Sequence, residues 1–142
     1  MLNRCMSRTR PITLALSLIG TMVSLAQDQN YADCVAKSQS SWGRPCDKCE
    51  AYTESYKRDY RGVYQIELKN TCGDAVELKV AMQEGHGRWR TFPVKALAPG
   101  ENMTAFACNG TGKYLYWVRR LNDTEILLPS DQEILTEYRD RR

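Results

Sequence analysis

The stretch RPCDKCEAY, residues 44–52, places Cys46 and Cys49 three positions apart. Two thiols at this spacing can form a redox couple, part of a zinc site, a haem attachment site, or two ends of separate structural disulfides. Covalent haem attachment requires a histidine directly after the second cysteine, and position 50 is Glu. A zinc site requires four ligands, and the sequence adds only an isolated Cys34 and the single histidine, His86. We therefore expect neither a metal nor a cofactor.

A thioredoxin-like couple requires the first thiolate to lie at the N-terminus of a helix. Cys46 meets this condition, because Asp47 and Glu50 resemble a capping box at the start of a predicted helix over about 48–59. The βαβ pattern of that fold is missing, however, and the downstream sequence is typical of antiparallel strands. We interpret the cysteines as structural, and a thiol–disulfide protein using Cys46 and Cys49 stays as the alternative.

Five cysteines remain once a predicted leader is removed, so one thiol is left over. Cys72 and Cys108 both lie in turn contexts at strand ends, which predicts a disulfide between them. Closing that loop of 37 residues would stabilise the fold by about 4 kcal/mol in the chain-entropy model. Cys34 would then pair with Cys46 or Cys49, and the spare thiol would be buried, linked to another chain, or reactive.

Aromatic residues provide the candidate binding surface. In the predicted strand 114–121, Tyr114 and Tyr116 point to one face and Trp117 to the other, so one set is expected to be less buried. Such a row, together with Trp89, could stack on sugar rings or fill a pocket of a partner protein. The alternative is that helices and the opposing sheet cover both sets. His86 lies between two glycines and is expected at a solvated hairpin tip.

Residues 1–26 have the pattern of a secretory signal peptide. Three arginines precede an apolar run of about 15 residues, which is too short to span a bilayer and ends in Ser24-Leu-Ala26. Cleavage after Ala26 would leave 116 residues, enough for one small domain. These three arginines are the whole excess of 20 basic over 17 acidic residues, so the mature chain has no net charge. We expect a secreted or periplasmic protein that binds no nucleic acid and has no stable membrane insertion.

The mature chain is predicted to be mainly β, a small antiparallel sandwich of about six strands with short N- and C-terminal helices. Residues 27–61 form a partly helical segment rich in Cys and Tyr, 62–129 the sandwich, and 130–142 a helix that begins at the capping box Ser130–Glu133. Alternation of apolar residues gives most of the strands. Pro93 places its strand at a sheet edge or at a bulge. The predicted strands are 63–69, 75–83, 89–94, 103–108, 114–121 and 125–128, the last two joined by a hairpin at Asn122-Asp123.

The segments IELKNTCGDAVELKV, LAPGE and ACNGTGKY, within residues 66–120, resemble small exported bacterial β-sandwich domains of uncharacterised function and, more loosely, thaumatin-like proteins. The resemblance implies a sandwich and a Cys72–Cys108 bridge. The dense disulfide array and acidic cleft of thaumatin-like proteins are missing, so their glycan-related activity does not carry over. With no catalytic constellation in the sequence, we expect a non-enzymatic binding module whose partner is a protein or a glycan.

Overall fold

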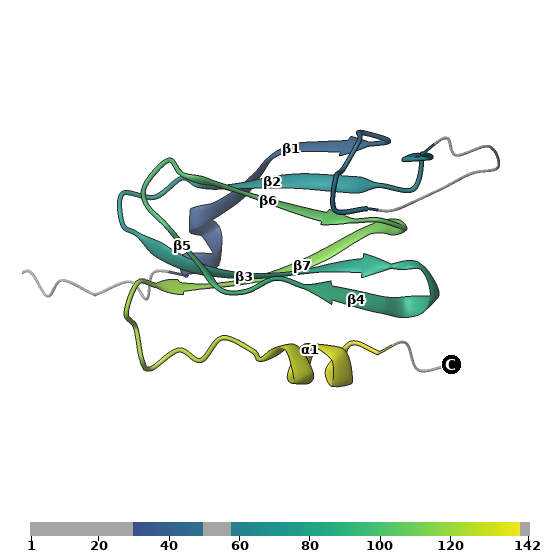
Figure 1. The fold of residues 1–142 in the computed structure, drawn as a ribbon. Coiled ribbons are helices and arrows are strands. Elements are labelled where there is room, and N and C mark those ends of the chain that lie inside the picture. The colour runs from purple at the N-terminus through teal and green to yellow at the C-terminus, as the bar shows by residue number, and fades with distance from the viewer. Residues whose placement is uncertain (1–29, 50–57, 140–142) are drawn as a thin grey trace, which may run out of the picture.

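The structure is a computed structural model that describes residues 30–49 and 58–139. Two antiparallel sheets pack face to face (Figure 1). The first has the order β1-β2-β6. In the second, β3 pairs with β7 on one side and with β4 and β5 on the other. The strands are β1 (Val35–Trp42), β2 (Tyr64–Asn70), β3 (Val76–Glu84), β4 (Arg88–Thr91), β5 (Lys95–Leu97), β6 (Asn102–Ala107) and β7 (Gly110–Arg120). The predicted β-sandwich is therefore confirmed, with seven described strands.

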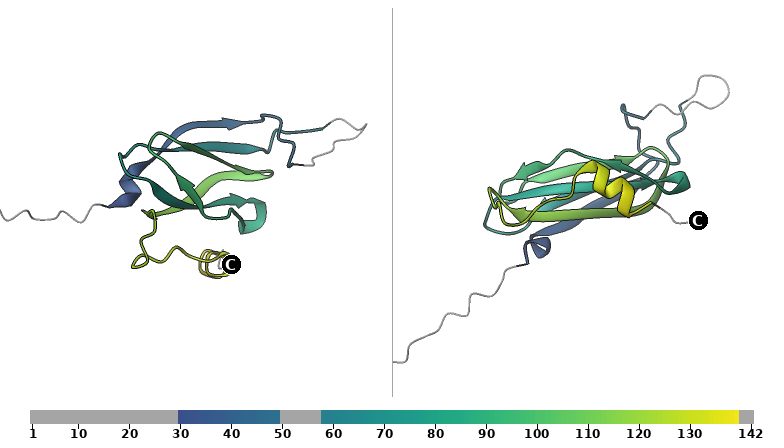
Figure 2. Two further views of the ribbon diagram at one scale, coloured as in Figure 1. Left: turned by 60° about the vertical axis from the view of Figure 1, so that its left-hand side comes forward. Right: turned by 90° about the horizontal axis from the view of Figure 1, so that it is seen from below.

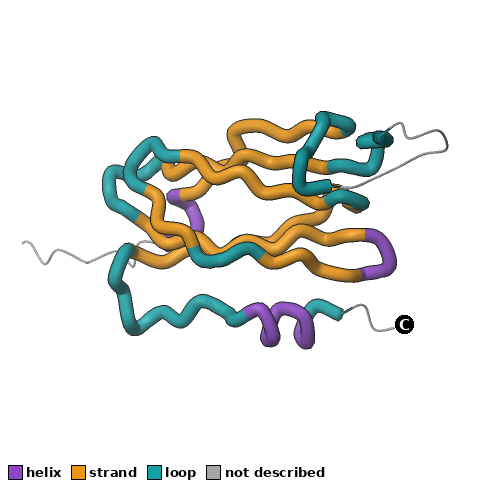
Figure 3. The backbone as a smooth tube through the Cα atoms, viewed as in Figure 1, coloured by secondary structure: helices purple, strands orange, loops and turns teal. Residues whose placement is uncertain are grey.

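Alternating apolar residues on β2, β3 and β6 form the core between the sheets. In β2, for example, Ile66 and Leu68 are buried while Lys69 is exposed. Because strand side chains alternate between the two faces, this pattern fixes which face points inward. The tube view in Figure 3 shows the two layers and the turns that join them. The main core cluster comprises Cys34, Val35, Tyr64, Ile66, Leu68, Val76, Leu78, Val80, Met82, Leu97, Met103, Ala105 and Ala107.

Pro93 interrupts one edge of the second sheet, as predicted. The predicted strand 89–94 ends early: only residues 89–91 belong to β4, and β5 begins after the prediction ends. The two strands flank residues 92–94 and pair with the same side of β3. Phe92 still donates its N–H to the Val80 carbonyl at 3.0 Å. Proline has no N–H to donate, so the ladder resumes only at Lys95.

The C-terminal helix α1 (Asp131–Glu137) covers the outer face of the second sheet, as the view from below in Figure 2 shows. Its predicted capping box is present: Ser130 Oγ accepts from the Glu133 N–H, and the Glu133 carboxylate accepts from the Ser130 N–H. Ile134 is fully buried. The predicted strand 125–128 is wrong. After a turn at Asn122, whose φ is 62°, the chain runs to α1 without joining a sheet, so the predicted hairpin is also wrong.

The N-terminal segment differs from the prediction in one element. A short 3-10 helix, η1 (Tyr31–Cys34), is present, and β1 follows it directly. This strand was not predicted, because its sequence VAKSQSSW lacks apolar alternation. The predicted helix over 48–59 lies mostly outside the described residues. Within the part of the chain that the structure describes, no helix is both long and apolar enough to cross a membrane.

Candidate functional site

Both disulfides differ from the predicted pairs. Cys34 is bonded to Cys72, and Cys49 to Cys108. The predicted Cys72–Cys108 bridge is wrong because these residues follow β2 and β6, which are antiparallel neighbours. Their C-terminal ends therefore lie at opposite ends of the sandwich, separated by the strand length of about 20 Å. Cys34 likewise pairs with neither Cys46 nor Cys49.

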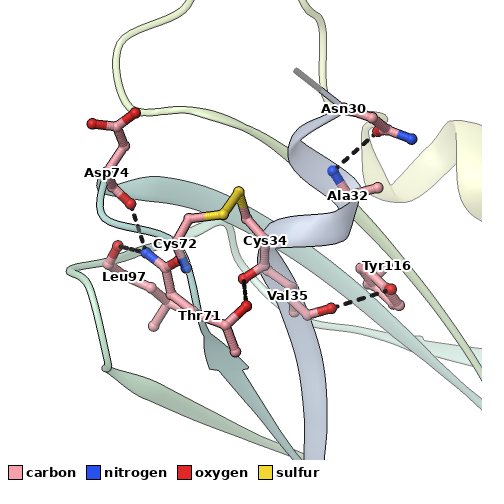
Figure 4. The surroundings of a disulfide bond; sticks show 10 residues. Asn30, Ala32, Cys34, Val35, Thr71, Cys72, Asp74, Leu97 and Tyr116 are labelled. Atoms are coloured by element: carbon pink, nitrogen blue, oxygen red, sulfur yellow. Dashed lines mark hydrogen bonds between the residues drawn. A yellow bond between two sulfur atoms is a disulfide. The ribbon is translucent and has the colours of Figure 1, made fainter. Parts of the chain in front are cut away.

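The Cys34–Cys72 disulfide ties the start of β1 to the turn after β2 (Figure 4). Two further contacts hold the same junction: the Thr71 N–H and hydroxyl both donate to the Cys34 carbonyl, at 2.7 and 3.1 Å. Cys34 is 1% exposed and belongs to the main core cluster. This disulfide is therefore a structural one.

The Cys49–Cys108 disulfide lies at the other end of the sandwich, in a second cluster with Val63 and Phe106. Cys46 packs against this cluster, is half-buried, and is the one described cysteine outside a disulfide. The CxxC motif thus contains one bonded and one free sulfur. It is neither a closed redox pair nor a purely structural pair.

A groove lies on the outer face of the second sheet, where β7 bulges. Between the pairs Met82–Tyr114 and Glu84–Gly110, β3 has only Gln83, whereas β7 has three residues. Bulges of this kind re-aim side chains and occur next to functional sites. Gly112 within the bulge has φ 85°, in the left-handed region. The groove has a volume of about 480 Å3 and is lined by Gln83, Trp89, Gly112, Lys113, Tyr114, Leu115 and Tyr138.

The polar chemistry of this groove centres on Gln83, which is 6% exposed. Its Oε1 accepts a hydrogen bond from Thr111 Oγ1 at 2.7 Å. The two amide N–H donors have no partner among the described residues and adjoin the groove. Trp89 is held at the rim because its indole N–H donates to the Tyr138 carbonyl at 2.9 Å. Within the described part of the chain no buried side-chain nitrogen or oxygen lacks a partner, so these donors are accessible from the groove, which combines them with aromatic rings.

The four predicted binding aromatics do not form one exposed row. Tyr114 and Tyr116 stack at 6.3 Å between centroids and pack against the main core, and the Tyr116 hydroxyl reaches the Val35 carbonyl at 3.5 Å. Trp117 lies on the outer face, with its ring 5.9 Å from that of Tyr138. Only Trp89 and Tyr114 line the groove. Sequence reasoning missed Gln83, Lys113 and Tyr138; the glycines around the bulge were the available signal.

Helix α1 is attached to this face by an ion pair. Lys79 is buried on β3, and its Nζ donates to Asp131 Oδ1 at 2.5 Å and to the Phe92 carbonyl at 2.6 Å. The hydrogen bond from Lys79 holds the pKa of Asp131 below its ordinary value. The Asp131 side chain is 63% exposed, so water reaches the pair from one side. This contact positions Tyr138 at the groove.

His86 lies in the turn η2 (Gly85–Gly87) between β3 and β4, with φ 64°, and is exposed as predicted. Among the described residues, no three His, Cys, Asp or Glu side chains gather where they could hold a metal ion. Comparison of the chain with protein-family models, with curated proteins and with solved structures finds no match. The resemblance over residues 66–120 therefore stays a prediction.

Proposed function

We propose that this chain is an exported binding module that holds a glycan in the groove between β4, the β7 bulge and Tyr138. The observation that carries the proposal is Gln83. Thr111 fixes the Gln83 side chain through Oε1, and the two amide donors of Gln83, unpartnered among the described residues, are open to the groove, where they suit a ligand rich in acceptor oxygens. Sugar hydroxyls meet this requirement, and the flanking Trp89 and Tyr138 rings suit the apolar face of a sugar ring. The predicted leader and the two disulfides support export to an oxidising compartment.

The test is binding of the mature chain to a glycan array, followed by titration with the best glycan. Gln83→Met keeps the volume and removes the amide donors, so we expect affinity to fall about tenfold, in line with the loss of two hydrogen bonds of about 0.5–1.5 kcal/mol each. Gln65→Met is the matched control, because Gln65 is a half-buried glutamine on the outer side of β2 in the other sheet. Its affinity should equal that of the natural chain.

Two results would contradict the proposal. If no glycan binds, the ligand class is wrong. If Gln83→Met and Gln65→Met bind equally well, the ligand is held elsewhere than in the groove. Turnover of a bound glycan that depends on particular side chains would contradict the non-enzymatic part of the proposal.

A further inference from the structure

Three cysteine residues share one end of the sandwich. Cys49 is bonded to Cys108 and is 1% exposed, whereas Cys46 and Cys108 are half-buried. The Cys49 N–H donates to the Cys46 carbonyl at 3.0 Å. This turn holds the free thiol and one bonded sulfur on the same short segment, and both residues contact the same apolar cluster. The free thiol is thus placed next to a disulfide that it could attack.

A cation is fixed beside the other sulfur of that disulfide. Arg90 Nη2 lies 3.6 Å from Cys108 Sγ. Its guanidinium is held by Glu84 Oε1 at 3.0 Å and lies over the Phe106 ring at 5.1 Å. The same Glu84 oxygen accepts from the Cys108 N–H at 3.0 Å. Lys48 Nζ lies over the same ring at 5.8 Å. Arg90 is therefore in direct contact with this sulfur, and a second cation, Lys48, lies over the adjacent Phe106 ring.

We propose that Cys46, Cys49 and Cys108 form a thiol–disulfide exchange site. Cys46 loses its proton to solvent, and its thiolate attacks Cys49 Sγ. The Cys46–Cys49 bond forms as the Cys49–Cys108 bond breaks, and Cys108 leaves as a thiolate that later takes a proton from solvent. The exchange needs no external oxidant or reductant. Arg90 stabilises the leaving thiolate, because a neighbouring cation favours the charged form and a better leaving group departs faster.

Exchange would have a defined structural result. Residues 43–49 would lose their covalent link to the turn between β6 and β7, and the sandwich would open at this end. The Cys34–Cys72 disulfide would be unaffected, because it belongs to the main core cluster at the opposite end. After the exchange, the disulfide that a partner thiol meets is Cys46–Cys49, within one short segment. Before the exchange it is Cys49–Cys108, in which Cys49 is buried. The proposal does not depend on the groove.

The test measures how fast reduced glutathione opens each disulfide of the mature chain at pH 8. Thiols are trapped over time with N-ethylmaleimide and located in tryptic peptides. Cleavage after Lys48 separates Cys46 from Cys49, so a bond between them appears as two linked peptides. We expect the Cys49–Cys108 bond to open at least tenfold faster in the natural chain than in Cys46→Ser, with the Cys46–Cys49 pair as an intermediate. Cys34–Cys72 is the internal control and should open equally slowly in both.

Arg90 provides the second variant. Arg90→Gln should slow opening of the Cys49–Cys108 bond about three- to tenfold, and Arg90→Lys should restore most of the rate, because the positive charge is what matters. If Arg90 had a purely structural role, Arg90→Gln and Arg90→Lys would change the rate equally. Circular dichroism checks that both variants are folded. Equal rates in the natural chain and Cys46→Ser would overturn the proposal. Gln83→Met, which is expected to weaken glycan binding, should leave the rates of disulfide opening unchanged.

Discussion

Asn70 is the buried side chain on which two turns depend. It is fully buried, and its amide nitrogen donates to the carbonyls of Asp74 and Leu97, at 2.8 and 3.1 Å. Its Oδ1 accepts from the Cys72 N–H at 3.0 Å. The backbone of Asn70 also bonds to the turn that follows β5, through Gly100 and Glu101. A side chain that could make only one of these contacts would leave backbone groups unpaired.

We expect Asn70→Ala to lower the free energy of unfolding by about 2–4 kcal/mol, since each buried group left unpaired costs about 1–3 kcal/mol. Urea unfolding followed by circular dichroism measures this. Asn102→Ala is the matched control: Asn102 is exposed, its one described side-chain bond is to Glu67, and its loss should cost under about 0.5 kcal/mol. Similar costs for the two variants would show that the Asn70 network contributes little.

At the level of single residues, sequence reasoning found the turn at Asn70-Thr-Cys72 but not its role. The residue types predict a turn, because Asn and Gly tolerate tight backbone geometry. They do not reveal that the Asn70 side chain faces the core and bonds to Leu97, which is 27 positions away. The disulfide partners were missed for the same reason: which cysteines meet depends on strand order, and spacing does not encode strand order.

Among the elements, strands with apolar alternation were predicted closely and polar ones were not. β2 and β3 are shifted by one residue from the predicted ranges. β1 was missed because it is an edge strand whose residues are mostly exposed, so burial imposes no alternation on it. The predicted strand 125–128 has strand-forming residues, but Leu127 is 83% exposed and pairs with no described strand. The groove depends on the β7 bulge, which no periodic pattern predicts.

Attachment of α1 should depend on pH through Asp131. Its pKa in the folded chain lies below the ordinary value of 3.8, because Lys79 donates to the charged carboxylate. A lowered folded pKa stabilises the fold above the unfolded pKa, and that contribution is lost as the pH falls through the folded pKa. The helix should therefore loosen below pH 3.8. Fluorescence of Trp89 and Trp117, which both contact Tyr138, reports the change.

The control for this prediction is Asp131→Asn, which removes the titrating group and keeps the side-chain volume. Its fluorescence should already resemble the acid form at pH 6 and change little between pH 4 and pH 2. If the fluorescence of the natural chain and of Asp131→Asn changes identically with pH, the acid transition belongs to another carboxylate. Glu133 is the first candidate, since hydrogen bonds from Ser130 also lower its pKa.

Over the whole molecule, the two disulfides close overlapping loops. Cys34–Cys72 spans 38 positions and Cys49–Cys108 spans 59, and the second loop begins inside the first. In the chain-entropy model each stabilises the fold by about 4 kcal/mol. Together they approach the whole stability of a small domain, about 5–15 kcal/mol. The core lies between two sheets of short strands, so we expect the reduced chain to have a small free energy of unfolding.

Because the fold depends on its disulfides, the need for an oxidising compartment can be tested. Residues 27–142 produced in a reducing cytosol should be unfolded or aggregated, whereas the full chain should reach an oxidising compartment, begin at Gln27 and be soluble. Intact mass should then show four hydrogen atoms fewer than the reduced mature chain, and alkylation without reduction should label one thiol. Mass spectrometry and far-ultraviolet circular dichroism check both forms. A cytosolic chain that is folded with all five cysteines reduced would contradict export as a requirement, because the core alone would then stabilise the sandwich.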